Sequence, residues 1–172
     1  MPSLPQPAFP LTGLDRARPS RFAAAVSPAT RALTRGVCRL LAAHGYGAMI
    51  EFPLTNGRRV DVIGLGVAGD FAIVEIKTSV ADFRADRKWQ EYLPYCERFY
   101  FAVPEDFPHH MVPDDCGLMV ADAFGGTIRR DSPARAVNAT RKRHQLLRFA
   151  LAASERLHRL CDPGALDALT RG

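Results

Sequence analysis

Two segments near the middle of the chain alternate between apolar and charged side chains. They cover residues 60–65 and 71–77, and this period of two is typical of β-strands with one buried face. The residues between them, 66–70, include glycine at both 66 and 69, which favours a hairpin turn centred on Ala68. The sequence therefore predicts an antiparallel pair of strands at this point.

The position of the turn predicts which residues of this hairpin face each other. Because the numbers of facing residues in an antiparallel pair have a constant sum, a turn centred on Ala68 sets Asp61 opposite Glu75 and Arg59 opposite Lys77. Facing side chains have Cβ atoms about 4.5 to 5.5 Å apart, so these four would form one charged face. The opposite, buried face is predicted to contain Val60, Val62, Val74 and Ile76.

Apolar periodicity predicts further elements on both sides of the hairpin. A helix fits residues 28–44 and ends at Gly45, and a strand fits residues 47–54. With the elements that follow the hairpin, the order is typical of an α/β fold in which helices flank a mixed sheet. The later strands are predicted over residues 97–103, 117–123 and 125–130, and a long helix over residues 135–160.

A helix is also predicted to begin directly after the hairpin. Ser79 with an aspartate three residues later resembles a capping box, and the helix would continue to about residue 92. Trp89 and Tyr92 lie on its apolar stripe. We interpret them as packing anchors, and a platform for base stacking is the alternative.

Length and composition indicate one compact domain. The chain has 172 residues, of which 47% are hydrophobic, which is enough for a single core. Residues 1–28 hold Pro, Ser and Arg without periodicity and are expected to be a mobile or loosely docked leader. We assign residues 29–162 to the domain and residues 163–172 to a C-terminal tail. No apolar run approaches about 18 residues and no signal peptide is recognisable, so a cytoplasmic protein without a membrane span is expected.

The charges divide the chain into three parts. Residues 1–50 contain six Lys/Arg and one acidic residue, a net charge of +5. Residues 51–122 contain seven Lys/Arg and thirteen acidic residues, a net charge of −6. Residues 123–172 contain ten Lys/Arg and four acidic residues, a net charge of +6. An acidic centre between basic flanks suits a metal-dependent enzyme that acts on nucleic acid. Solvated helix faces are the alternative interpretation. The residues predicted to contact phosphates are Arg31, Arg35 and Arg39 on the first helix and Arg141, Lys142, Arg143 and Arg148 on the last.

The facing carboxylates of Asp61 and Glu75 predict a metal site. Like charges directly opposite each other repel, and a hard divalent ion such as Mg²⁺ would compensate them. The backbone carbonyl of Ile76 could add a ligand, and Lys77 could orient or help deprotonate a metal-bound water, or balance charge on a phosphate under attack. The implied chemistry is hydrolysis of a phosphodiester, and an ordinary ion pair between Lys77 and one carboxylate is the alternative.

Three further residues could belong to this site. Glu51 lies among apolar neighbours and would either add to the metal site or be an exposed residue at an edge. Lys88 would contact phosphate, or form a solvated pair with a neighbouring acid. Arg59, on the predicted charged face, is also expected to contact nucleic acid.

The residues around these carboxylates resemble known families. Asp61, followed by Glu75-Ile76-Lys77 on a hairpin, resembles the core motif of the PD-(D/E)xK nuclease superfamily, with Val60 where the superfamily's name has a proline. More narrowly, the chain resembles the MmcB-like family of bacterial DNA-repair proteins over about residues 30–160. The matching runs are NGRRVD at 56–61, VEIKTSVADFRADRKWQEY at 74–92, FYFAVP at 99–104 and GLMVAD at 117–122.

This resemblance implies a restriction-endonuclease-like fold in a single domain, with Mg²⁺ or Mn²⁺ at Asp61 and Glu75 and a catalytic Lys77. We expect a metal-dependent DNA hydrolase, most simply an endonuclease, that acts in bacterial DNA repair. A non-catalytic DNA-binding or scaffold protein with the same fold is the alternative, and RNA remains an open substrate. A homodimer would supply two active sites for a duplex, and other DNA-repair proteins would be further partners, although the sequence identifies no interface for either. No Walker loop, dinucleotide fingerprint or Gly-x-Ser-x-Gly motif is present.

Overall fold

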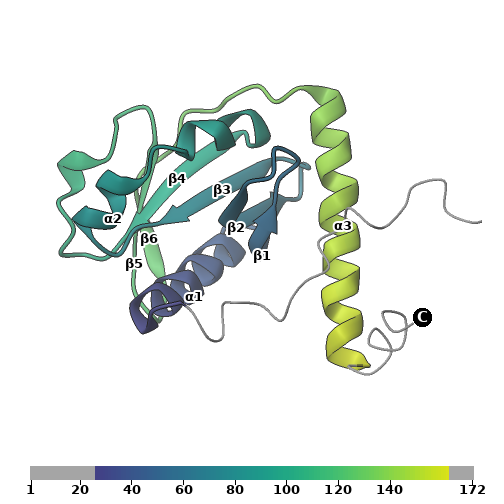
Figure 1. Cartoon of the computed structure of the whole chain (residues 1–172), viewed down its shortest axis with the longest axis horizontal. Helices are drawn as coiled ribbons and strands as arrows, with labels where there is room; N and C mark the ends of the chain where they lie inside the picture. The colour runs from purple at the N-terminus through teal and green to yellow at the C-terminus, as the bar shows by residue number, and fades with distance from the viewer. Residues whose placement is uncertain (1–25, 163–172) are drawn as a thin grey trace, which may run out of the picture.

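Six strands form one mixed sheet with helices packed against both of its faces (Figure 1). The computed structural model describes residues 26–162, so the predicted leader and tail lie outside the described residues, apart from residues 26–28. The predicted α/β class with a mixed sheet flanked by helices is confirmed. The strands are β1 (Tyr46–Pro53), β2 (Arg59–Gly66), β3 (Phe71–Ile76), β4 (Arg98–Val103), β5 (Gly117–Ala121) and β6 (Gly126–Arg130). The α-helices are α1 (Pro28–Ala43), α2 (Val80–Ala85) and α3 (Ala139–Cys161), and the 3₁₀ helices are η3 (Trp89–Tyr95) and η4 (His109–Met111).

The strands lie in the sheet in the order in which they occur in the chain. Neighbours are antiparallel from β1 to β3, parallel from β3 to β5, and antiparallel again at β6. The hairpin of β2 and β3 pairs Val62 with Val74 and Leu65 with Phe71, the register that a turn centred on Ala68 requires. The predicted hairpin and its register are therefore confirmed.

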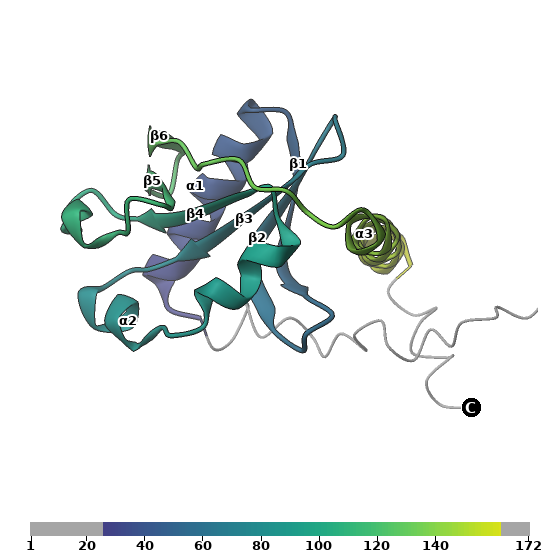
Figure 2. The ribbon, with the colours of Figure 1, turned by 90° about the horizontal axis from the view of Figure 1, so that it is seen from above.

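Helix α1 covers one face of the sheet (Figure 2). Its first turn is capped by Ser27, whose hydroxyl accepts a hydrogen bond from the Thr30 amide at 3.1 Å. It ends before Gly45, whose φ of +80° is one that glycine adopts without strain. The buried side chains between helix and sheet are Leu33, Val37, Leu40, Leu41, Val62, Val74 and Ile76.

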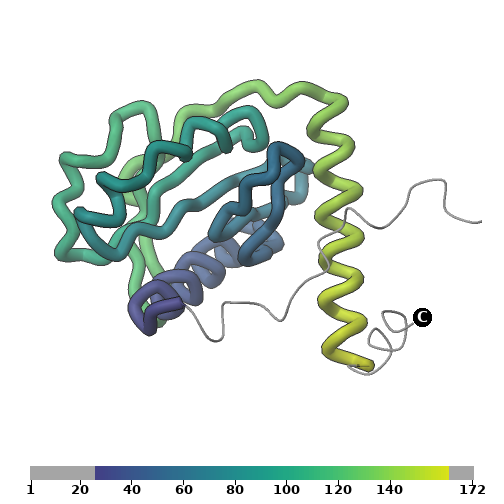
Figure 3. Tube along the Cα trace, viewed as in Figure 1, coloured from purple at the N-terminus to yellow at the C-terminus, as the bar shows by residue number. Residues whose placement is uncertain are grey.

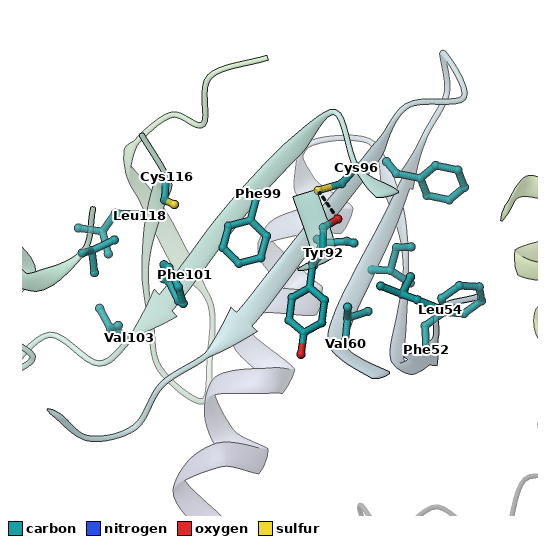
Figure 4. Close-up of a cluster of buried hydrophobic side chains, with 14 of the residues drawn as sticks. Phe52, Leu54, Val60, Tyr92, Cys96, Phe99, Phe101, Val103, Cys116 and Leu118 are labelled. Atoms are coloured by element: carbon teal, nitrogen blue, oxygen red, sulfur yellow. Dashed lines mark hydrogen bonds between the residues drawn. The ribbon is translucent and has the colours of Figure 1, made fainter. Parts of the chain in front are cut away.

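An aromatic core fills the other face, beneath η3 (Figure 4). Trp89 stacks on Phe99 with ring centroids 5.6 Å apart, and Phe99 lies 5.1 Å from Phe101. Tyr92 is buried, with its ring 6.4 Å from that of Phe99. The interpretation of Trp89 and Tyr92 as packing anchors is confirmed.

Helix α3 runs along the β1 edge of the sheet, apart from α1 and α2 (Figures 1 and 3), and contacts η3 through Gln145, which donates to the Tyr95 carbonyl at 2.7 Å. Phe149 packs on Phe52, with ring centroids 5.9 Å apart. On the same helix, Arg148 donates to the Pro53 carbonyl at 3.1 Å and Arg156 donates to the Ile50 carbonyl at 2.7 Å. Arginine side chains thus occupy backbone acceptors of an edge strand that could otherwise pair with another chain.

The predicted continuous helix from Ser79 to residue 92 is wrong. Ser79 does cap α2, since its hydroxyl accepts from the Asp82 amide at 3.1 Å, but α2 ends at Ala85. Asp86 has extended backbone angles, and its carboxylate accepts from the Lys88 amide at 2.8 Å. This side-chain hydrogen bond replaces the next helical turn, and the chain resumes as η3 in a different direction.

The predicted faces of β2 are correct only from Val62 onward. Val60 packs in the aromatic core with Ile63, whereas Val62 packs beneath α1. The alternation changes phase between them, at Asp61, and the neighbouring strand changes at Glu51, whose φ is +49°. Irregular backbone in both strands therefore moves Val60 to the face opposite the predicted one.

The four cysteines are free thiols within the described residues. Cys96 and Cys116 are buried, whereas Cys161 is exposed at the end of α3. Among residues 26–162, no helix combines the length and apolar character that a membrane crossing needs.

Candidate active site

Asp61 and Glu75 meet where β2 and β3 stop pairing. The last paired residues of the hairpin at this end are Val62 and Val74, one position before the two acids. In place of the next ladder bond, the Asp61 carboxylate accepts from the Ile76 amide at 2.9 Å, and Glu75 Oε1 accepts from the Asp61 amide at 3.4 Å. The sequence prediction that these two acids lie together is thus supported by contacts from each side chain to the other strand.

Lys77 lies at the same end of the sheet, directly after β3. Its amide donates to the Ala102 carbonyl of β4 at 2.9 Å, which holds the backbone in line with the sheet. Its ammonium lies 3.6 Å from Glu75 and 2.7 Å from Asp86. All three side chains are largely buried, with exposed fractions of 7% for Lys77, 6% for Glu75 and 11% for Asp86.

Burial disfavours the ionised form of both carboxyl groups. Burial raises the pKa of Glu75 well above its ordinary value, and the charge of Asp61 raises it further. Burial also raises the pKa of Asp61, against the hydrogen bond from Ile76 and the charge of Lys77, which lower it. One ammonium therefore faces more negative charge than it can balance, because Asp86 shares it.

Lys77 itself is held as a cation. Burial alone would lower the pKa of Lys77, but the hydrogen bond to Asp86 and the charge of Glu75 raise it overall. Burial alone would raise the pKa of Asp86. The hydrogen bonds from Lys77 and from the Lys88 amide outweigh burial and lower this pKa below its ordinary value. At neutral pH the pair is an ammonium and a carboxylate.

Tyr92 adds a hydroxyl to the same surroundings. Burial raises the pKa of Tyr92, and the charges of Glu75, Asp86 and Asp61 raise it further, in that order. The phenol is therefore neutral at physiological pH, and it lies near enough to all three acids for their charges to act on it. In this form it can donate a hydrogen bond.

Glu51 and Arg59 lie beside the site, on the β1 side. Glu51 occupies the break in β1 opposite Asp61, between the paired residues Ile50 and Phe52. Its carboxylate lies 3.6 Å from the Arg59 guanidinium. The predicted facing of Arg59 and Lys77 is wrong, because β2 and β3 separate before they reach these residues.

The donors present suit a hard cation. Carboxylate oxygens are the ligands that Mg²⁺ and Mn²⁺ prefer, and one or two of them commonly suffice when water and substrate complete the shell. Asp61 and Glu75 are such a pair, and burial, the main cause of the raised pKa of each carboxyl, penalises ionised forms that a bound cation would stabilise. Among residues 26–162 there is no group of three or more acidic, His or Cys side chains that could hold a metal ion.

The predicted phosphate contacts on α1 do not reach this site. Glu75 shares a face of β3 with Phe71 and Ile73, which belong to the aromatic core. Helix α1 covers the opposite face of the sheet (Figure 2). Arg35 donates to the Ala123 carbonyl at 2.8 Å, and Arg39 donates to the Phe124 carbonyl at 3.0 Å. Both therefore bind the connection between β5 and β6. Arg31 lies on the same helix.

The basic residues of α3 serve different purposes. Lys142 pairs with Glu97 at 2.6 Å, and Arg141 lies over the Tyr95 ring, 5.2 Å from its centroid. Arg143 is exposed, and Arg148 contacts the end of β1. Most of this cluster thus helps to dock α3.

Lys88 is exposed at the start of η3. Its expected partners are engaged elsewhere, because Asp86 pairs with Lys77 and Glu91 forms two hydrogen bonds with Arg58, at 2.7 and 2.8 Å. The phosphate contact of Lys88 stays a prediction.

Asp86 is the site residue that the sequence prediction missed. A continuous helix over this segment would have placed it on a solvated surface. Its residue type could have indicated this role, because aspartate disfavours the interior of a helix and favours the position at which a helix begins. Read in that way, Asp86 indicates the break that lets it turn toward Lys77.

Comparison with known proteins identifies the family of the chain. The family model for "DNA repair protein MmcB-like" matches residues 18–164. The chain belongs to the MmcB-like family. DNA repair is therefore the setting in which this MmcB-like protein has to be understood.

One solved structure supports the fold of this MmcB-like chain. It is the "SPO1766 protein of unknown function from Silicibacter pomeroyi", which is 42% identical with a TM-score of 0.77. The alignment covers 82% of the present chain and 96% of the other. No curated protein matches the chain. Activity therefore has to be argued from the site itself.

Proposed function

We propose that this MmcB-like protein is a metal-dependent deoxyribonuclease that hydrolyses DNA phosphodiester bonds during repair. The observation that supports it is the meeting of Asp61, Glu75 and Lys77 where β2 and β3 separate, with both carboxyl pKa values raised. The resemblance of these three residues to the PD-(D/E)xK motif supports the same reaction. Mg²⁺ or Mn²⁺ is the proposed cofactor.

Each protein group has a separate proposed task. Asp61 and Glu75 would hold the metal, with the Ile76 carbonyl as a further oxygen. When bound, the metal would polarise the phosphodiester and lower the pKa of a bound water. Lys77, kept protonated by Asp86, would stabilise negative charge on the phosphate as it is attacked. This assigns Lys77 an electrostatic role in place of the proton abstraction considered from the sequence.

A non-catalytic DNA-binding protein of a repair complex is the second candidate. One observation favours it: the charged groups already have partners inside the protein. Asp61 accepts from Ile76, Glu75 accepts from Asp61, and Lys77 binds Asp86. A site that had lost its chemistry could keep this arrangement as a structural ion-pair network.

Cleavage assays distinguish the two candidates. Labelled single-stranded, duplex, flapped and branched DNA, with a matched RNA strand, would be incubated with Mg²⁺ or Mn²⁺. The wild type would be compared with Asp61→Asn, Glu75→Gln and Lys77→Met. The matched control is Asp114→Asn, which removes an exposed carboxylate that pairs with Arg130 at 2.8 Å. DNA binding and thermal unfolding would be measured for every variant.

We expect the wild type and Asp114→Asn to cut DNA equally. Each site variant should lose at least about a hundredfold in rate, the loss seen when one group that stabilises transition-state charge is removed. Cutting that persists in all three variants contradicts the assignment of the site. If the wild type binds DNA and cuts nothing with either metal, the non-catalytic protein is the function that remains.

A further inference from the structure

We infer that a cleft between the β1–β2 turn and α3 binds a backbone phosphate of the DNA strand, about two nucleotides from the phosphate that lies at Asp61 and Glu75. The cleft has a volume of about 680 Å³, and its basic lining residues are Arg58, Arg59 and Arg148. The proposal rests on DNA as the substrate of the proposed function and adds the path that the strand follows.

Arg148 is placed at the cleft by a single backbone contact. Its guanidinium donates to the Pro53 carbonyl at 3.1 Å, while its Nε is buried without a partner among the described residues. An arginine has five N–H donors, so the protein leaves donor capacity unused at this position. No acidic side chain pairs with Arg148 among residues 26–162. A phosphate oxygen is the acceptor that such a group binds well.

Arg59 faces the same cleft and is held loosely. Its side chain is 51% exposed and lies 3.6 Å from Glu51, a longer contact than a charge-assisted hydrogen bond. Arg58 differs, because two hydrogen bonds of 2.7 and 2.8 Å tie it to Glu91. Arg58 therefore fixes the wall of the cleft, and Arg59 and Arg148 are the two cations left for an anion.

The cleft and the candidate active site lie at the same end of the sheet. Arg59 begins β2, two residues before Asp61, and its strand partner is Pro53, the residue that Arg148 binds. Two residues of strand span about 7 Å, which is about the rise of two nucleotides in one DNA strand. A strand with one phosphate at Asp61 and Glu75 would thus bring a nearby phosphate to these arginines.

The test measures DNA binding under conditions in which metal-dependent cleavage cannot occur. A fluorescent single-stranded oligonucleotide would be titrated with full-length protein in EDTA over a series of salt concentrations. The variants are Arg59→Gln, Arg148→Gln and the double variant. The control is Arg129→Gln, which removes an exposed charge on β6, at the opposite edge of the sheet and outside the cleft. Unfolding temperatures show whether a variant is folded, and Arg59→Gln keeps the test decisive if Arg148→Gln is not.

Each phosphate contact on single-stranded DNA contributes about 0.7 to the slope of log K against log salt. We expect each cleft variant to lower that slope by about 0.7, the double variant to lower it by about 1.4, and Arg129→Gln to leave it unchanged. An equal effect of Arg129→Gln, or unchanged slopes in the cleft variants, overturns the proposal. Competition by inorganic phosphate as strong as competition by an oligonucleotide also overturns it, because the cleft would then bind free phosphate.

The outcome is separable from that of the proposed function. Lowered slopes in a protein that cuts no DNA would support the cleft and remove the nuclease. If the wild type cuts DNA and the cleft variants bind DNA with unchanged salt dependence, the nuclease would be supported and the cleft proposal overturned.

Discussion

The ammonium of Lys77 and the carboxylate of Asp86 lie 2.7 Å apart, although helix α2 separates them in the chain. The contact closes the segment that leaves β3 back onto the end of that strand. It also keeps Lys77 protonated, since it raises the pKa of Lys77 against the effect of burial. Asp86 thereby controls both the position and the charge of the lysine.

Replacing Asp86 with alanine should weaken catalysis without removing any group that we assign to the metal. Lys77 would keep only the 3.6 Å contact with Glu75, so its position and its pKa would both change. We expect a lower kcat with little change in KM. Since Asp86 raises the pKa of Lys77, the alkaline limb of the pH–rate profile should move to lower pH in the variant.

Asp106→Ala is the control for this experiment, because Asp106 is an exposed aspartate in the loop after β4. Loss of a hydrogen bond to a charged group should destabilise Asp86→Ala by about 1.5 to 3 kcal/mol, so assays belong well below its unfolding temperature. A lower kcat with an unshifted pH profile would mean that Asp86 acts only through stability.

Glu75→Gln should stabilise the metal-free protein at neutral and alkaline pH. The pKa of Glu75 is raised in the folded state, so the folded protein binds this proton more tightly than the unfolded chain does. Stability therefore falls as the pH rises from the ordinary glutamate value of about 4.3 through the folded pKa. Glutamine carries no charge and avoids that loss. We expect a gain of about 1 kcal/mol at pH 8, or about 2 to 4 °C in Tm, and none at pH 4.

Denaturant unfolding at both pH values, in EDTA, measures this difference. Glu105→Gln is the control, since Glu105 is 72% exposed in its pair with Arg129 and should change stability little at either pH. A Glu75→Gln variant that is less stable than the wild type at pH 8 would show that attraction to Lys77 outweighs burial and the charge of Asp61.

Binding of Mg²⁺ should release protons at mildly acidic pH. Both proposed ligands have carboxyl pKa values above the ordinary range, and a metal binds only their ionised forms. Calorimetric titrations at about pH 6, in two buffers of different ionisation enthalpy, give the number of protons released. We expect a positive number for the wild type and a smaller one for Glu75→Gln. Binding with no proton release would place the metal elsewhere.

The central hairpin could be predicted from the sequence because one short turn and a period of two determine it. A turn centred on Ala68 leads directly to the pairing of Val62 with Val74, and one step further brings Asp61 to Glu75. The break at Glu51 could not be predicted in this way, because a positive φ at a non-glycine residue leaves no periodic signal. The local pattern therefore predicted that Asp61 and Glu75 lie together, but it did not predict the face on which Val60 lies.

The surface around the site was harder to predict. Arg35 and Arg39 have the four-residue spacing of a basic helix face, yet both bind the connection after β5. Spacing shows that side chains share a face but not which part of the sheet that face meets. Asp86 illustrates the same limit, since its role depends on a turn made by its own side chain.

Gly36 lets α1 dock closely on the connection between β5 and β6, and its replacement by alanine should be destabilising. A Cβ at this position would collide with the backbone carbonyl oxygens of Asp122 and Gly125, which cannot rotate away. Alanine normally favours a helix over glycine by about 1 kcal/mol, so a loss despite this gain would come from the contact. We expect a net loss of about 1 to 3 kcal/mol in denaturant unfolding, the usual range for overpacking. Gly125→Ala is the matched control, because nothing lies within 4 Å of a Cβ built there. Equal stability of both variants would show that α1 can move away from the sheet, and Arg35 and Arg39 would then be able to leave their carbonyl partners for DNA.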